Sequence, residues 1–317
     1  MLRWLLIRTA GSARLARRAR ASELVGRVVH RYVAGENLDE GLAAARRIAA
    51  SGAELTLDHV GEFVASIDQA KAAAEVYRTL LEHIGRDGLP AGISVKPTQL
   101  GLMLDHETCA TLVEDLASHA HDAGVHLTLD MEDHPVVEDT IRLVERAQAA
   151  GHHNVGCAVQ AYLHRTTEDV RRLIAAGASL RLCKGAYAEP EHVAYQRRVD
   201  VDRAYLEAAR YLLAHGTMPR FATHDHRLVA AIKRSAAQLG RDRSTYEFQM
   251  LYGIREEMQR SLVADGYGLR IYVQFGTEWF SYFTRRLAER PANLVFFLRA
   301  LRPTGTTGTK DTSTPTA

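Results

Sequence analysis

Residues 179–187, with the sequence SLRLCKGAY, alternate apolar and polar side chains in the way that a buried β-strand does. The two leucines share one face of the strand, Arg181 and Cys183 share the other, and Lys184 opens a Gly-Ala turn. An unpaired guanidinium is too costly to keep in a sheet core, so Arg181 implies a carboxylate partner, an anion or a polar ligand inside the fold. From this stretch alone, a core ion pair and a ligand-binding cation both remain open.

Seven more short runs of alternating apolar residues occur along the chain, and a helical pattern follows each of them. The eight runs are 54–61, 92–98, 126–132, 154–162, 179–185, 220–225, 245–251 and 269–276. Their starts lie 24 to 41 residues apart, which is the length of a strand and a crossover helix. Eight such units predict an α/β fold of the (βα)8 TIM-barrel type, which typically needs ~250 residues.

The composition of the 317 residues is that of a soluble globular chain, with 46% apolar and 25% charged residues. A formal net charge of +2, without a basic run interleaved with aromatic residues, argues against a nucleic-acid-binding protein. The three cysteines, Cys109, Cys157 and Cys183, are far apart in the sequence, which argues against a disulfide framework and for a reducing compartment. The GxGxxG fingerprint of a dinucleotide-binding fold does not occur.

The pattern predicts three regions: an N-terminal helical arm at 1–50, a catalytic barrel at 51–301 and a disordered tail at 302–317, which is rich in Thr, Ser, Pro and Gly. Asn37 is placed to cap a helix in the arm, LDEGLAAARRIAA, which Gly52 ends. Several arginines and no acidic residue precede Glu23. The first 22 residues therefore fit a solvated helix, a mitochondrial-type presequence or a basic membrane-surface arm.

Polar side chains share the face of each predicted strand that opposes the apolar set. Because one face of a barrel strand packs on the helices, the other face points into the barrel. The inward polar set comprises Asp58, Lys96, Asp130, Gln160, Arg181, His224, Glu247 or Gln249, and Tyr272. Barrel interiors are usually filled with Val, Ile and Leu, so a polar residue near the end of nearly every strand predicts a ligand site at the C-terminal face of the barrel.

A helix is predicted after the eighth strand, over residues 277–291. Tyr282, Arg285, Arg286 and Glu289 have the spacing of one helix face. Two adjacent arginines with a tyrosine one turn earlier suit a carboxylate or a phosphate. The alternative is a solvated basic face on which Glu289 pairs with Arg285.

Seven motifs resemble those of the proline dehydrogenases, in this order along the predicted strands and the last helix: SVKPTQLG, LDMED, AVQAYLHRT, RLCKGAY, THD, EFQMLYG and YFTRRLAER. The resemblance is to the short monofunctional bacterial type and covers residues 28–289. RLCKGAY and YFTRRLAER are the most specific of the motifs.

The resemblance implies a distorted (βα)8 barrel with N-terminal helices and with its last helix over the barrel mouth. It further implies noncovalently bound FAD and the oxidation of L-proline to Δ1-pyrroline-5-carboxylate, the first step of proline catabolism. A quinone is the electron acceptor that the family suggests. The implied location is the cytoplasm, and the alternative is peripheral contact with the inner face of the plasma membrane. Neither a nucleic-acid partner nor a metal is expected.

The roles of single residues follow from the same resemblance. The implied catalytic residues are Asp130 and Arg181, and the implied substrate-binding residues are Lys96, Leu251, Tyr272, Tyr282, Arg285 and Arg286. The implied cofactor-binding residues are Met131, Gln160, Arg181, Lys184, Gly185, Ala186, Thr223 and His224. Two positions depart from the family pattern, because Cys183 stands where an aliphatic residue is common and Gln274 stands where a proline often occurs.

Three other functions fit parts of the pattern. A metal-dependent hydrolase on the same barrel would use His224 and His226 with Asp58 or Asp130, although Arg181 and Lys96 would oppose a cation. A Schiff-base aldolase would use Lys184 or Lys96 as its nucleophile. A barrel without activity that only binds a ligand is the third, because a fold does not guarantee a function.

Overall fold

The computed structural model describes residues 32–61 and 63–279. Three predicted segments lie outside these residues: the basic segment at the N-terminus, the expected helix with Tyr282, Arg285 and Arg286, and the tail. The helix expected after Asn37 is present as α4 (Leu38–Ala49), within the predicted arm. The Asn37 side chain accepts a hydrogen bond from the N–H of Glu40, as its capping role requires.

Eight parallel strands close into a barrel in which each strand pairs with the next along the chain and β8 pairs with β1. The strands are β1 Glu54–His59, β2 Ala91–Val95, β3 Leu127–Leu129, β4 Val155–Gln160, β5 Ser179–Cys183, β6 Arg220–Ala222, β7 Glu247–Leu251 and β8 Gly268–Phe275. Each coincides with one of the eight runs expected from the sequence. The prediction of a (βα)8 barrel is therefore confirmed.

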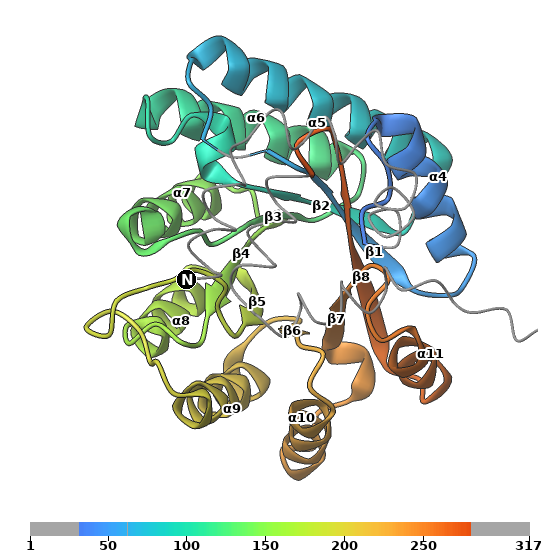
Figure 1. Ribbon diagram of the computed structural model, residues 1–317, viewed down its shortest axis with the longest axis vertical. Helices are drawn as coiled ribbons and strands as arrows, with labels where there is room; N and C mark the ends of the chain where they lie inside the picture. Colours follow the sequence, from blue (N-terminus) through green and yellow to red (C-terminus); the bar gives the residue numbers. More distant parts are fainter. Residues whose placement is uncertain (1–31, 62, 280–317) are drawn as a thin grey trace, which may run out of the picture.

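The helices form a ring outside the barrel (Figure 1). After α4 they are α5 Ile67–Asp87, α6 His106–Asp122, α7 Val137–Ala149, α8 Thr166–Ala175, α9 Arg198–His215, α10 His226–Gln238 and α11 Glu256–Ala264, with the short 3-10 helices η1 Pro97–Leu100, η2 His134–Val136 and η3 Arg243–Thr245. Asp105 and Asp225 cap α6 and α10 by accepting from the second residue of each helix. The connections before these helices lie at the C-terminal face of the barrel.

The alternation within each strand separates an apolar layer from a polar one. On β5, Leu180 and Leu182 are buried under the helices, whereas Arg181 points into the barrel and is also buried. The same holds for β1, where Leu55 and Leu57 belong to the hydrophobic core and Asp58 lies inside. The core between the strands and the helices is thus apolar, whereas the barrel interior contains charged side chains.

Helix α4 lies against the seam between β1 and β8 (Figure 1). Its Gly41 packs on the ring of Phe275, where a Cβ atom would lie 2.8 Å from the ring. Just before the helix, the N–H of Ala34 donates to the carbonyl of Gln274 at 2.8 Å. The N-terminal arm is therefore anchored to the last strand of the barrel.

Three charged residues fill the N-terminal end of the barrel, here called the barrel floor: Arg220, Glu247 and Arg270. Glu247 accepts from Arg270 Nε at 2.8 Å and lies 3.6 Å from Arg220 Nε. Burial alone would raise the pKa of Glu247, but the two guanidinium groups outweigh it and hold that pKa below its usual value. Glycine at positions 92 and 156 lets the neighbouring chain approach closely, because a Cβ atom there would lie 2.8 Å from the carbonyl oxygen of His126 and 2.4 Å from that of Ser179.

Replacing Glu247 with Gln should strongly destabilise the fold. The change keeps the volume but leaves Arg220 and Arg270 buried without their shared carboxylate, which costs about 3–5 kcal/mol in comparable cases. Urea unfolding measures the loss. Glu256→Gln is the matched control, since its exposed carboxylate lies 3.9 Å from Arg260 on α11 and is worth less than about 1 kcal/mol. Equal losses in the two variants would contradict a structural role of the floor.

Candidate active site

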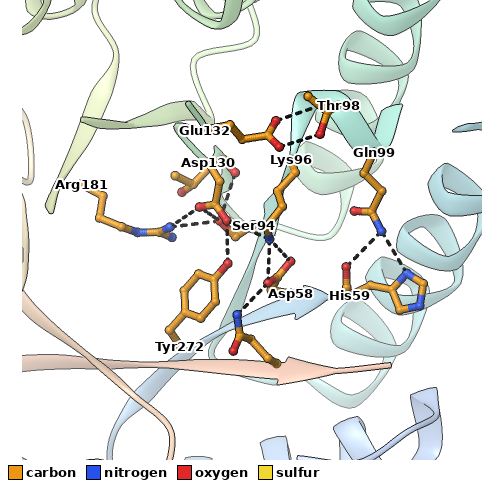
Figure 2. Close-up of polar contacts among 12 residues, drawn as sticks. Asp58, His59, Ser94, Lys96, Thr98, Gln99, Asp130, Glu132, Arg181 and Tyr272 are labelled. Atoms are coloured by element: carbon orange, nitrogen blue, oxygen red, sulfur yellow. Dashed lines mark hydrogen bonds and ion pairs between the residues drawn. The ribbon is translucent and has the colours of Figure 1, made fainter. Parts of the chain in front are cut away.

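Asp130 is the centre of a hydrogen-bonded cluster at the C-terminal half of the barrel interior (Figure 2). Its Oδ1 accepts from Ser94 Oγ at 2.7 Å and from Arg181 Nη1 at 2.7 Å. Its Oδ2 accepts from the Tyr272 hydroxyl at 2.6 Å and from Lys96 Nζ at 3.4 Å. Side chains from β2, from the residue after β2, from β5 and from β8 thus all contact one carboxylate, which lies directly after β3.

Asp58 holds the other side of Lys96. Lys96 Nζ donates to both carboxylate oxygens of Asp58, at 3.0 and 2.9 Å, and the Gln274 amide donates to the same carboxylate at 3.2 Å. Asp58 is fully buried and Lys96 nearly so. We call Asp58, Lys96, Asp130 and Arg181 the charge quartet.

The quartet carries two cations and two carboxylates and is therefore balanced. Burial would raise the pKa of Asp130, but Lys96 and Arg181 outweigh it and hold this pKa below its usual value. Burial would lower the pKa of Lys96, but its acidic neighbours, Asp58 first among them, hold it well above the usual value. Burial and the nearby Asp130 raise the pKa of Tyr272 well above 10.0. All of these groups therefore keep one protonation state near neutral pH.

Arg181 combines an ion pair with a spare donor. Its Nε donates to Gln249 Oε1 at 2.7 Å, and its guanidinium carbon lies 5.1 Å from the centre of the Tyr272 ring. Its Nη2 is buried and has no hydrogen-bond partner among residues 32–61 and 63–279. The ion pair with Asp130 is the core ion pair that was one of the two alternatives for Arg181. Its Nη2 group can still donate to a ligand. Of the two inward candidates on β7, Gln249 belongs to this site and Glu247 belongs to the floor.

Tyr77 supports the quartet from outside the barrel. Its hydroxyl, on α5, donates to the carbonyl of Ser94 at 3.0 Å and lies 3.4 Å from Asp58 Oδ1. It also accepts from the N–H of His59 at 3.2 Å. The sequence contains no sign of this role, because Tyr77 has the spacing of an ordinary buried residue on an amphipathic helix.

The side chains expected to bind the cofactor lie around the ends of β4 and β5. Gln160 donates to the carbonyl of Glu132 at 2.8 Å and accepts from the N–H of Ala186 at 3.3 Å. Gly185 has a φ of +120°, and a Cβ atom there would lie 2.1 Å from the ring of Tyr162. Only glycine fits this turn, for reasons of both backbone conformation and space.

Other predicted cofactor residues lie further along the rim. Lys184 pairs with Asp202 of α9 at 2.5 Å and with Asp225 at 3.5 Å. Thr223 Oγ1 accepts from the N–H of Asp225, and His224 Nε2 accepts from the N–H of Leu251 at 2.9 Å. These contacts join the ends of β5, β6 and β7 without reaching the quartet.

Met131 and Leu251 are the remaining described positions expected in the site, and Gln274 and Cys183 are the two departures from the family pattern. Met131 is buried directly after Asp130, and Leu251 is the register partner of Tyr272. The unusual Gln274 is buried and donates to Asp58, so this departure adds a contact to the quartet. Cys183, the second departure, is partly buried. Tyr282, Arg285 and Arg286 lie outside the described residues.

No group of three or more His, Cys, Asp and Glu side chains in the described part of the chain is arranged to hold a metal ion. His224 and His226, the pair on which a metal-dependent hydrolase would rely, follow β6, and His224 accepts a backbone hydrogen bond. Asp58 and Asp130 are already paired with cations. The geometry therefore offers this alternative no donor set within the described residues.

A family model described as "Proline dehydrogenase" matches residues 41–299 of this chain. The chain belongs to the proline dehydrogenase family. The family resemblance and the classification as an oxidoreductase acting on proline, both expected from the motifs, are confirmed.

Named relatives agree with this assignment. Proline dehydrogenase 1 of Bacillus subtilis is 37% identical over 271 residues, which cover 86% of this chain and 89% of that protein. Proline dehydrogenase of Deinococcus radiodurans is 33% identical over 285 residues, which cover 89% and 92%.

A solved structure shares the fold. It is proline utilization A (PutA) from Bdellovibrio bacteriovorus inactivated by N-propargylglycine, with a TM-score of 0.77 and 26% identity over 83% of this chain. This chain spans only 32% of the length of that protein. The monofunctional relatives are therefore the ones that match it over most of their length.

Replacing Gly185 with Ala should distort the turn that follows β5. The new Cβ would meet the Tyr162 ring, and the backbone would be strained as well, so we expect a lower melting temperature and loss of any cofactor bound there. Gly88→Ala is the matched control, because Gly88 has a φ of +59° at the end of α5 but open space around it. Strain alone costs about 1–2 kcal/mol. A Gly185→Ala variant that matches this control in stability and cofactor content would contradict the role of the turn.

Proposed function

We propose that this protein oxidises L-proline to Δ1-pyrroline-5-carboxylate with FAD as its cofactor and passes the electrons to a quinone. The observation that supports this best is the charge quartet at the C-terminal half of the barrel, next to a spare donor of Arg181. Such a site orients a small zwitterion next to a cofactor at the face where (βα)8 enzymes have their active sites.

The residues present fit a flavin. Arg181 Nη2 is a buried donor without a partner in the described residues, and a buried guanidinium suits a polar or anionic group. The turn at Gly185 packs closely on the ring of Tyr162, and Gln160 binds the N–H of Ala186 in the same turn, next to Lys184. We propose that these residues, with Met131, Thr223 and His224, hold the FAD. When bound, it supplies the hydride acceptor, N5.

The carboxylate of proline needs more positive charge than the quartet has. Asp58 and Asp130 already balance the positive charge of Lys96. A further anion next to Lys96 therefore gains little electrostatic stabilisation from the quartet. Arg285 and Arg286 would supply the excess charge and a fork geometry, with Lys96 as the third member of the clamp. Tyr272, Tyr282 and Leu251 would enclose the ring of the substrate.

Asp130 is suited to orientation rather than to proton abstraction. Its carboxylate accepts four hydrogen bonds and its pKa is lowered, so it is a weak base near neutral pH. Asp130 holds Arg181, Lys96 and Tyr272 in place. Because it is a weak base, another group or water must take the ammonium proton of the bound proline. That proton must leave before the hydride leaves the ring carbon next to nitrogen. Holding the reacting groups in register can lower the barrier by several kcal/mol, roughly 7–11 at the limit.

The purified protein tests the proposal directly. A flavin absorption spectrum that is bleached under anaerobic conditions by L-proline, but not by D-proline, would establish cofactor and substrate together. A colourless protein that retains a stoichiometric metal would instead favour the hydrolase. Trapping of a carbonyl substrate by borohydride on Lys184 or Lys96 would favour the aldolase.

Arg285→Met and Arg286→Met should each raise the KM for proline by about tenfold or more, since each removes charge-assisted hydrogen bonds to the carboxylate. Flavin content should stay unchanged. Arg260→Met is the matched control, because this arginine of α11 is exposed and lies 3.9 Å from its i,i+4 partner Glu256. Unchanged proline kinetics in both variants would reject the clamp.

The proposed electron acceptor and the proposed cellular location rest on the family resemblance. No helix in the described ranges is long and apolar enough to cross a membrane. We propose a cytoplasmic enzyme that reduces quinone at the inner face of the plasma membrane, where the basic residues of segment 1–22 would contact anionic lipid. Flotation with anionic liposomes that is unaffected by deleting residues 1–22 would exclude this segment as the anchor.

A further inference from the structure

Lys96 occupies a position that leaves the next turn without a local cap. It is the N-cap residue of η1, where Ser, Thr, Asp or Asn would usually accept from a free N–H, and its side chain makes no capping hydrogen bond. The lysine side chain points into the barrel instead and binds Asp58. Pro97 has no N–H and the N–H of Gln99 donates to the carbonyl of Lys96, so the N–H of Thr98 depends on an acceptor from elsewhere in the fold.

Glu132 supplies that acceptor from the loop after β3 (Figure 2). Its Oε2 accepts from the backbone N–H of Thr98 at 3.0 Å, and its Oε1 accepts from the Thr98 hydroxyl at 2.6 Å. The two oxygens thus bind both donors of one residue, two positions after Lys96. Glu132 is fully buried and Thr98 is 1% exposed, so water does not compete for these bonds.

Glu132 also links neighbouring loops. Its backbone carbonyl accepts from Gln160, which in turn accepts from the N–H of Ala186. On the other side, the Thr98 hydroxyl lies 3.4 Å from the N–H of Phe63, in the loop after β1. The loops after β1 to β5 are therefore connected through one acidic residue that lies outside the quartet.

We propose that Glu132 is a positioning residue for the carboxylate of the substrate, and that it acts by fixing the turn that carries Lys96. The proposal rests on the proposed function, because it takes proline as the ligand. A buried carboxylate is expensive, and an apolar residue of the same volume would pack there at lower cost. The two bonds to Thr98 hold the turn that follows Lys96, and a displacement of about 1 Å in a binding group can cost about a hundredfold in rate.

Two substitutions separate the hydrogen bonds from the bulk of the side chain. Glu132→Met keeps the length of the side chain and removes both acceptors. Glu132→Gln keeps an acceptor for the Thr98 N–H and offers a donor to its hydroxyl. We expect Glu132→Met to raise the KM for proline by about tenfold, with kcat and flavin content within about twofold of the parent, and Glu132→Gln to restore most of the loss.

A double-mutant cycle with Lys96→Met tests the mechanism. If Glu132 acts through Lys96, Glu132→Met changes the KM much less when Lys96 is already absent. If Glu132→Met raises the KM by the same factor in the parent and in Lys96→Met, the proposal is overturned. A fall in kcat without a change in KM would also overturn it. Should Glu132→Met fail to fold, Thr98→Val removes the hydroxyl alone and should give a smaller rise in KM with the same dependence on Lys96, whereas Thr98→Ser should match the parent.

A readout without activity distinguishes this proposal from the proposed function. Hydrogen exchange of the backbone amides at 96–102 should quicken in Glu132→Met while exchange in α10 stays as in the parent. Unchanged exchange at 96–102 would overturn the cap. A parent protein that does not oxidise proline, but in which this exchange still depends on Glu132, would reject the proposed function and the role in substrate binding while leaving the cap itself established.

Discussion

Charge pairing inside the barrel is the constraint on which the rest of the structure depends. A (βα)8 barrel is ordinarily filled with branched apolar side chains, whereas this one encloses arginines, a lysine and carboxylates at two levels. Each buried charge is tolerable only while its partner stays in place, because a charge left alone inside a protein costs several kcal/mol. The strands and the supporting tyrosine of α5 can both be understood as means of keeping these partners together.

Each of the two levels contains a buried guanidinium nitrogen without a hydrogen-bond partner in the described residues, Arg220 Nε in the floor and Arg181 Nη2 in the quartet. In the floor, Glu247 is bonded to Arg270 and Gln249 and lies close to Arg220, so its carboxylate is fully used by the fold. In the quartet, the carboxylates are likewise used by their cations. Arg181 Nη2 differs from Arg220 Nε in its place, because the quartet lies at the C-terminal half of the barrel, where (βα)8 enzymes have their active sites.

Much of this arrangement can be predicted from the sequence, because strand rhythm and side-chain alternation are local properties. Alternation alone places Lys96, Arg181 and Tyr272 inside a barrel. It does not show which inward residues meet at the same level, so Glu247 and Gln249 remain equivalent until the register is known. Tyr77 cannot be found in this way, since a buried tyrosine on a helix has no sequence feature that separates a hydrogen-bonding role from a packing role.

Arg181 shows why the two expectations for a buried arginine need not exclude each other. A guanidinium has five N–H donors in a fixed plane. Three of its bonds, to Gln249, Asp130 and Ser94, involve Nε and Nη1, so the fold uses both of these nitrogens. The same bonds fix the plane and therefore the direction in which Nη2 points, whatever ligand is present. The ion pair is thus the reason that the remaining donor is preorganised, and a lysine at this position would hold the charge without fixing a direction.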